Sequence, residues 1–145
     1  MEMRRNAFSL RGESGLVKIV SDSVFDSDND GAFYIDNAQC DIIVESNGFR
    51  VNRTIVLNMP QVVSFLRELG DIMERGSGEA ILRTEGNELS LVFKGFGVEP
   101  LVLCAMNDKR EGKENSIQVK FAIEPAYYAD LKRDLAEAKI LAPHR

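Results

Sequence analysis

The chain contains 145 residues, a length typical of one domain, since domains have about 100–200 residues. Hydrophobic residues make up 44% and charged residues 28% of it, which excludes a disordered, collagen-like or membrane-embedded chain. The net charge of −5 disfavours general nucleic-acid binding, which requires a basic surface. We therefore expect a single domain over residues 1–145, with flexible tails at residues 1–6 and 142–145.

The first part of the chain has the pattern of β-strands. Residues 16–20 are short and β-branched, which favours a strand. Residues 40–45 and 49–57 flank Asn47-Gly48, and Asn-Gly is a strong hairpin signal because both central residues of a type I′ turn take positive φ. A two-residue loop at Asn47-Gly48 determines the register of the two flanking strands. It places Glu45 opposite Arg50, Val44 opposite Val51 and Cys40 opposite Ile55.

A helix is predicted after this hairpin. Asn58 is a candidate N-cap, Gln61 completes a capping-box-like pair, and Pro60 fits the first turn. Gly76 is a natural residue to end the helix. Apolar residues recur at spacings of three and four to form one buried stripe, namely Val62, Phe65, Leu66, Leu69, Ile72 and Met73.

The second half repeats the order of strands and then a helix. Residues 79–85 and 88–94 flank Gly86-Asn87, which predicts a hairpin with a two-residue loop. Residues 101–106 read as a strand, residues 107–115 as a nine-residue polar loop, and residues 116–123 as a half-buried strand. The pairs expected in the hairpin are Leu82 with Leu91, Ile81 with Val92 and Ala80 with Phe93.

A last helix is predicted to begin at Glu124-Pro125 and to bury Tyr128, Leu131 and Leu135. The pattern as a whole predicts an α+β fold, in which an antiparallel sheet of hairpins carries two helices on one face. The order of its elements is strands, helix, strands, helix.

The negative charge of the chain is concentrated in one segment. No Lys or Arg lies between Lys18 and Arg50, and the remaining chain holds 16 acidic and 18 basic residues. This segment is either a solvated surface or an acidic docking surface for a basic partner or a cation. The candidate partner-binding residues are Asp22, Asp26, Asp28, Asp30, Asp36, Asp41 and Glu45.

Part of the acidic segment resembles a calcium-binding loop. Asp26, Asp28, Asp30 and Gly31 match the first four conserved positions of an EF-hand loop. The twelfth position is Asn37 instead of glutamate, and the flanking sequence does not predict helices. The alternatives are a Ca²⁺ site formed by Asp26, Asp28 and Asp30, and an acidic turn whose side chains cap their own backbone. We expect no other metal or cofactor.

Catalysis is poorly supported by the sequence, and we expect a protein that is not an enzyme. The single histidine, His144, lies in the predicted tail, while Cys40 and Cys104 lie in apolar strands without CxxC spacing. We therefore interpret the two cysteines as buried, reduced thiols of a cytoplasmic protein. The chain has no secretory signal and no apolar run long enough to span a membrane. Arg50 and Arg53 near Phe49 are too few to predict nucleic-acid binding.

The order of elements resembles the WapI-type immunity proteins of bacterial polymorphic toxin systems and related small bacterial domains. The shared features are a helix after the first strands, a G-x-A-x-L strand start, a glycine-led strand, and a last strand that runs into a helix through a tyrosine. The resemblance covers roughly residues 38–139. The segments that carry it are Asn58–Leu69, Gly78–Leu91, Gly97–Leu103, Ile117–Glu124 and Tyr127–Leu131.

This resemblance implies an inhibitor without catalytic activity, which binds a toxin domain and blocks its active site or substrate groove. If the toxin acts on nucleic acid, its groove is basic, and the aspartates of the acidic segment would mimic phosphate there. Two alternatives stay open: an interaction module without an inhibitor role, which forms homo-oligomers, and a domain that binds Ca²⁺ or a small ligand. None of the three involves nucleic-acid or membrane binding by this chain.

Overall fold

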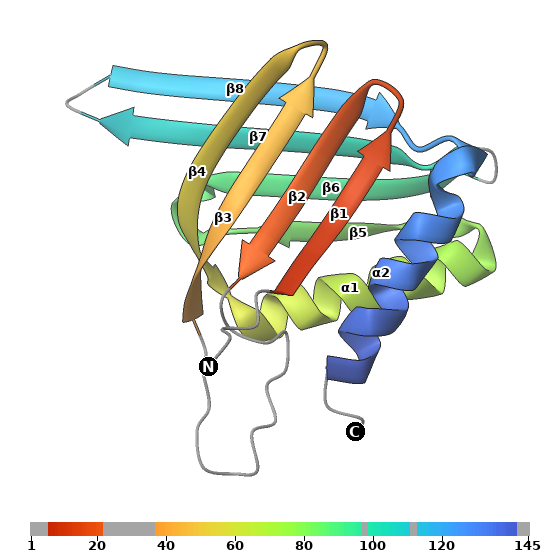
Figure 1. Cartoon of the computed structure of the whole chain (residues 1–145). Helices are drawn as coiled ribbons and strands as arrows, with labels where there is room; N and C mark the ends of the chain where they lie inside the picture. Colours follow the sequence, from red (N-terminus) through yellow and green to blue (C-terminus); the bar gives the residue numbers. More distant parts are fainter. Residues whose placement is uncertain (1–5, 22–36, 97–98, 111–112, 142–145) are drawn as a thin grey trace, which may run out of the picture.

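The computed structural model describes residues 6–21, 37–96, 99–110 and 113–141 (Figure 1). The strands form two antiparallel sheets of four strands each, the first with the order β1-β2-β3-β4 and the second with the order β5-β6-β7-β8. In chain order the elements are β1 (Asn6–Gly12), β2 (Gly15–Ser21), β3 (Asn37–Ser46), β4 (Phe49–Asn58), α1 (Met59–Arg75), β5 (Ser77–Arg83), η1 (Glu85–Asn87), β6 (Leu89–Phe96), β7 (Leu101–Arg110), β8 (Lys113–Ala122), η2 (Pro125–Tyr127) and α2 (Tyr128–Leu141). The α+β class, the antiparallel pairing and the order strands-helix-strands-helix are as predicted. The strands divide into two sheets instead of the single sheet expected, and the helices pack on β5 and β1 instead of on one common face.

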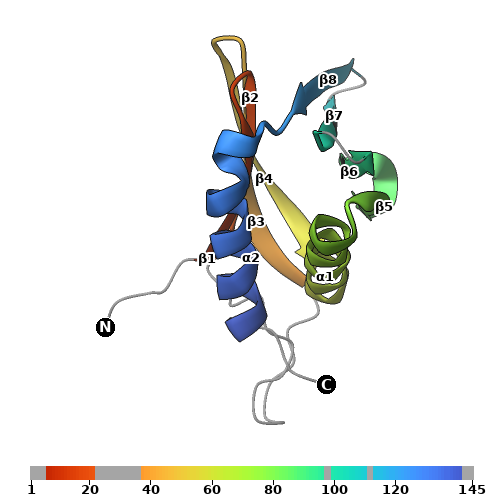
Figure 2. The ribbon, with the colours of Figure 1, turned by 90° about the vertical axis from the view of Figure 1, so that its right-hand side faces the viewer.

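The two sheets face each other across one hydrophobic core. Figure 2 shows them as two layers, and the strands of the first sheet run across those of the second in Figure 1. The largest fully buried side chains include Phe8 from β1, Phe65 from α1 and Phe93 from β6. All three belong to a single cluster of buried residues that also includes Leu131 and Leu135 of α2. Each sheet therefore covers the inner face of the other.

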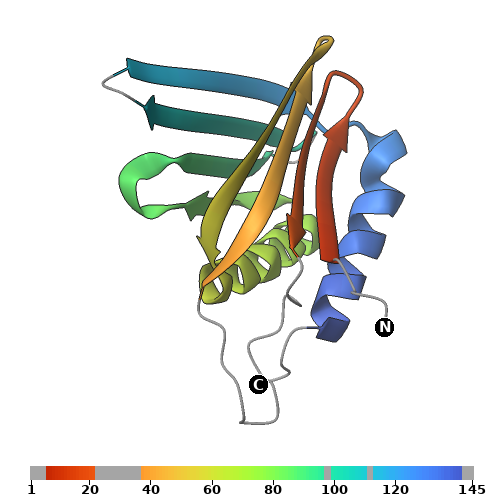
Figure 3. The ribbon, with the colours of Figure 1, turned by 60° about the vertical axis from the view of Figure 1, so that its left-hand side comes forward.

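Each helix packs against the sheet that it does not follow in sequence. Helix α1 follows the first sheet but packs mainly on β5, the edge strand of the second. Helix α2 follows the second sheet but packs on β1, the edge strand of the first (Figure 3). The backbone N–H of Ser9 in β1 donates to Asp134 Oδ2 in α2 at 3.1 Å. β1 is an edge strand, and this N–H is on the side of β1 that faces away from β2. The bond to Asp134 therefore gives the donor a partner.

Local sequence signals are accurate at the hairpin of β3 and β4 and at α1. The pairs Glu45–Arg50, Val44–Val51 and Cys40–Ile55 are confirmed, and φ is 49° at Asn47 and 83° at Gly48. Asn58 Oδ1 accepts from the N–H of Gln61 at 3.0 Å, so Asn58 is the N-cap. Gly76 ends the helix with φ 82°, and its N–H donates to the carbonyl of Ile72 at 2.7 Å.

Three local predictions differ from the structure. Strand β1 was not predicted, and its first residue, Asn6, was expected in a tail. The loop predicted at residues 107–115 is wrong, because β7 and β8 continue as a paired ribbon up to Arg110 and from Lys113. Pairing between β7 and β8 satisfies the backbone groups of this segment, so its polar side chains are no signal of a loop. The register of β5 and β6 is confirmed, but a five-residue connection, residues 84–88, replaces the predicted two-residue loop.

The turn between β1 and β2 joins the first sheet to the end of the second. Gly12 and Gly15 flank this turn, and a Cβ atom at Gly12 would overlap the carbonyl oxygen of Ala122, at the end of β8. The N–H of Glu13 donates to Glu124 Oε1 at 3.0 Å. Glycine is needed here because the two backbones approach too closely for a side chain, and not because of its φ.

We predict that Gly12→Ala lowers the free energy of unfolding by about 1–3 kcal/mol, because the added methyl group must displace the backbone of β8. Urea unfolding of the purified protein measures this change. Ser14→Ala, in the same turn but exposed, is the control and is expected to change stability by less than about 0.5 kcal/mol. Equal stability of the two variants would contradict this close approach.

Candidate functional site

Most of the predicted acidic surface lies outside the described residues. This is the case for Asp22, Asp26, Asp28, Asp30 and Asp36, which include the candidate Ca²⁺ loop. His144 also lies outside them, as do residues 1–5 and 142–145 of the predicted tails. The structure does place Asp41 and Glu45, both on the outer face of β3.

Asp41 and Glu45 are each paired with a side chain of β4. The hydroxyl of Thr54 donates to Asp41 Oδ1 at 2.9 Å, and Arg50 Nη1 donates to Glu45 Oε1 at 3.0 Å. The described part of this face is therefore mixed in charge. Any strong negative potential from the acidic segment has to come from its residues 22–36.

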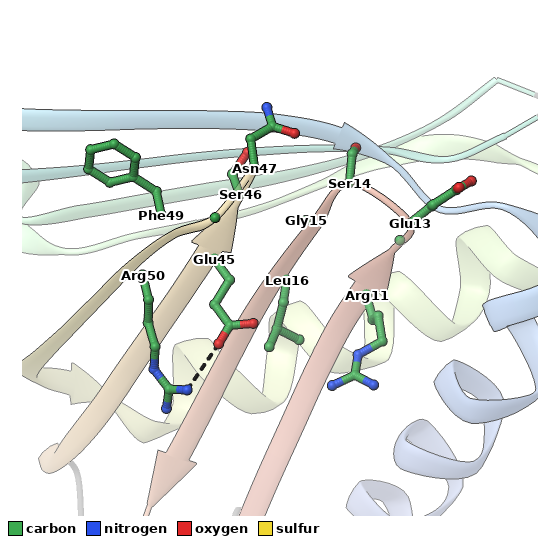
Figure 4. A pocket seen from close by; sticks show the side chains of 12 residues that line it. Arg11, Glu13, Ser14, Gly15, Leu16, Glu45, Ser46, Asn47, Phe49 and Arg50 are labelled. Atoms are coloured by element: carbon green, nitrogen blue, oxygen red, sulfur yellow. Dashed lines mark hydrogen bonds and ion pairs between the residues drawn. The ribbon is translucent and has the colours of Figure 1, made fainter.

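The strand ends of both hairpins of the first sheet meet at one end of the molecule and form a hollow of about 410 Å³ (Figure 4). We call this region the hairpin-end surface, and it consists of Arg11–Leu16 and Glu45–Arg50. The strand register aligns Arg11, Leu16, Glu45 and Arg50 in one row across the four strands. Leu16 is buried between Arg11 and Glu45 in this row, so the surface combines an apolar centre with charges of both signs.

Phe49 is the most exposed large hydrophobic residue of the described chain, with 70% of its surface accessible. It is the first residue of β4 and follows the Asn47-Gly48 turn, which extends it past the end of the core. In Figure 4 its ring lies at the margin of the hollow and points away from the Glu45–Arg50 ion pair. Successive side chains of a strand point to opposite faces, so Phe49 and Arg50 lie on different sides of the hairpin tip. An exposed aromatic ring is typical of the residues that dominate protein–protein binding.

Sequence reasoning did not identify Phe49 as a site residue. The hairpin prediction placed it next to the turn, and that position was the available signal. A large aromatic residue directly after a two-residue turn lies at the tip of a hairpin, where strand neighbours bury it on one side at most.

A second charged cluster joins β4 to the second sheet. Arg53 is 18% exposed, and its Nη1 donates to the carbonyl oxygen of Asn107 at 2.9 Å. Its Nη2 lies 3.7 Å from Glu88 Oε2 and 3.7 Å from Asp108 Oδ1. All these contacts are within the protein, so Arg53 acts as a link between the two sheets and not as a ligand-binding group.

Both cysteines are buried thiols that are not joined in a disulfide, as predicted. Burial raises the pKa of the Cys104 thiol to about 12, so it stays protonated at neutral pH and is a poor nucleophile. Among the described residues, no group of three or more His, Cys, Asp or Glu side chains is arranged to hold a metal ion. In the same part of the chain, neither helix has the length and apolar character to cross a membrane.

No protein-family model matches the chain, and no curated protein or solved structure matches it either. The resemblance to WapI-type immunity proteins therefore stays a prediction from the sequence pattern.

We predict that Arg53→Gln lowers the free energy of unfolding by about 1–3 kcal/mol, because it removes a charge-assisted contact of the half-buried Asp108 and the side-chain donor to the carbonyl of Asn107. Arg50→Gln is the matched control, since the Arg50–Glu45 pair is exposed and contributes about 0–1 kcal/mol. Chemical denaturation of the two variants compares them directly. If Arg50→Gln is the more destabilising variant, Arg53 does not link the sheets.

Proposed function

We propose that this chain is an immunity-type protein without enzymatic activity, which binds and neutralises a toxin domain in the bacterial cytoplasm. The hairpin-end surface is the main contact in this proposal. The main support for this proposal is the exposure of Phe49 beside a hollow. The rim of the hollow holds both hydrogen-bond donors and hydrogen-bond acceptors.

Phe49 has the properties of an interface anchor. Burying an aromatic ring on binding is strongly favourable and costs little conformational entropy, since only two side-chain torsions become fixed. Arg50 and Glu45 already hold each other in position at 3.0 Å, so their remaining donors and acceptors are pre-organised for a partner. The turn residues Ser46 and Asn47 add uncharged polar groups to the same rim.

A partner that binds the hairpin-end surface and extends along β3 would also reach the start of this strand. Strand β3 runs from Asn37 to Ser46, which belongs to the hairpin-end surface. Asn37 is the first described residue after residues 22–36, which hold five of the aspartates of the acidic segment. Its 10 residues span about 33 Å, which fits within an interface of standard size. Near Asn37 a polar cavity of about 500 Å³ is lined by two more carboxylates, those of Glu85 and Glu88. The two ends of β3 thus offer an aromatic anchor and an acidic region.

The proposal is tested with the toxin domain encoded by the reading frame next to this gene. Co-expression of the wild-type chain is expected to restore growth of bacteria that produce the toxin domain. Phe49→Ala is expected to weaken binding by at least about 30-fold, the effect of losing a hot-spot residue, without a change in stability. Ser64→Ala, at an exposed position of α1 away from the hairpin-end surface, is the control. Calorimetry measures both affinities.

Two results would count against the proposal, and they differ. If the chain does not neutralise the toxin domain, or if no toxin gene is adjacent, the immunity function is wrong. If the toxin is neutralised and Phe49→Ala binds as tightly as Ser64→Ala, the function stands but the contact surface lies elsewhere.

The acidic segment is tested separately through the rate of association. Changing Asp26, Asp28 and Asp30 to lysine is expected to slow association with a basic partner by about tenfold at low salt, because charge of one sign steers encounter. The control changes Glu68, Asp71 and Glu74, which are exposed on α1, to lysine and alters the net charge equally. Equal rates for the two triple variants would show that net charge, and not this segment, governs association.

A further inference from the structure

The outer face of the second sheet is not covered by either helix. In Figure 2 this face points away from both the first sheet and α1. Three rows of outward-pointing side chains cross all four strands. They are Glu79–Lys94–Leu101–Ala122, Ile81–Val92–Leu103–Lys120 and Arg83–Ser90–Ala105–Gln118.

The centre of this face is apolar and continuous. Ile81, Val92 and Leu103 are neighbours on three adjacent strands, and Leu101 and Ala105 flank Leu103 along β7. Ile81 is 45% exposed. A hollow of about 470 Å³ lies along Val92 and Leu103. The exposed face of an antiparallel sheet is normally polar, so a continuous apolar strip on it is typical of a binding surface.

The charges around the strip are mainly basic, although the whole chain carries a net charge of −5. In the three rows Arg83, Lys94 and Lys120 are basic, and Glu79 is the only acidic residue. Glu79 already pairs with Lys94, whose Nζ lies 3.7 Å from Glu79 Oε2. Within the described chain, Arg83 and Lys120 have no carboxylate at salt-bridge distance. These two exposed cations at opposite edges of the strip complement an acidic partner.

The dimensions of the strip match those of a helix. Three neighbouring strands at about 4.8 Å spacing give a strip about 10 Å wide, which is close to the diameter of an α-helix. Helices cover such sheet faces in layered α/β architectures by burying one apolar stripe. We propose that this face binds an acidic amphipathic α-helix of a partner protein. The apolar stripe of the helix contacts Ile81, Val92 and Leu103, and its carboxylates contact Arg83 and Lys120.

Two synthetic peptides of about 20 residues test this proposal on the full chain. Both carry the same apolar stripe of Leu and Ala, which is flanked by Glu in one peptide and by Lys in the other. Fluorescence anisotropy is expected to show binding of the acidic peptide at least about tenfold tighter than the basic one, the effect of two favourable ion pairs. NMR chemical shifts should change at β6 and β7 and not at the hairpin-end surface.

Two variants locate the charge and the apolar contact. The double variant Arg83→Glu with Lys120→Glu is expected to reverse the preference between the peptides, and Leu103→Asn to weaken both by about tenfold. All three residues point outward from the sheet, so folding should be retained, which circular dichroism checks.

Four results would overturn the proposal. They are equal affinity for the two peptides, chemical shift changes confined to other surfaces, binding to phosphatidylserine vesicles with no peptide binding, and self-association that buries β6 and β7. The last two would assign the face to a membrane surface or to a second copy of the chain.

Discussion

The burial of two sheets against each other is the constraint on which the rest of this structure depends. An antiparallel sheet of four strands has one apolar face that must be removed from water. In this chain neither helix lies across such a face, because each sheet covers the other. The helices are then free to close the edges at β1 and β5. In the described chain the outer face of the second sheet remains accessible, and one proposed binding surface lies there, while the other lies at the hairpin ends of the first sheet, beyond the shared core.

The exchange of helices between the halves makes each half depend on the other. Helix α2 closes the edge of β1 through packing and through Asp134, and Glu124 holds the turn between β1 and β2. Arg53 connects β4 to the second sheet from the opposite side of the core. Charged groups near the core thus serve to align the sheets. The groups that remain for recognition lie at strand ends and on outer faces, as at Phe49 and Arg83.

Features that depend on neighbouring residues could be predicted from the sequence. The Asn47-Gly48 turn determines the register of β3 and β4, and the caps Asn58 and Gly76 fix the ends of α1. The alternation of apolar residues shows which side chains are inside. It does not show which surface they pack against, so the division into two sheets could not be derived. The contacts of Arg53 depend on that division and were missed for this reason. Phe49 was missed although its position directly after the Asn47-Gly48 turn indicates the tip of a hairpin.

Native-state hydrogen exchange measured over a series of low urea concentrations tests the central claim most directly. If the two sheets share one core, the amides of β2 and β3 and those of β6 and β7 should exchange with the same free energy of opening and the same dependence on urea. That result would show a single cooperative unit. If one sheet retains protection under conditions where the other exchanges by a separate opening of lower free energy, the sheets are stable independently and this account of the fold is wrong.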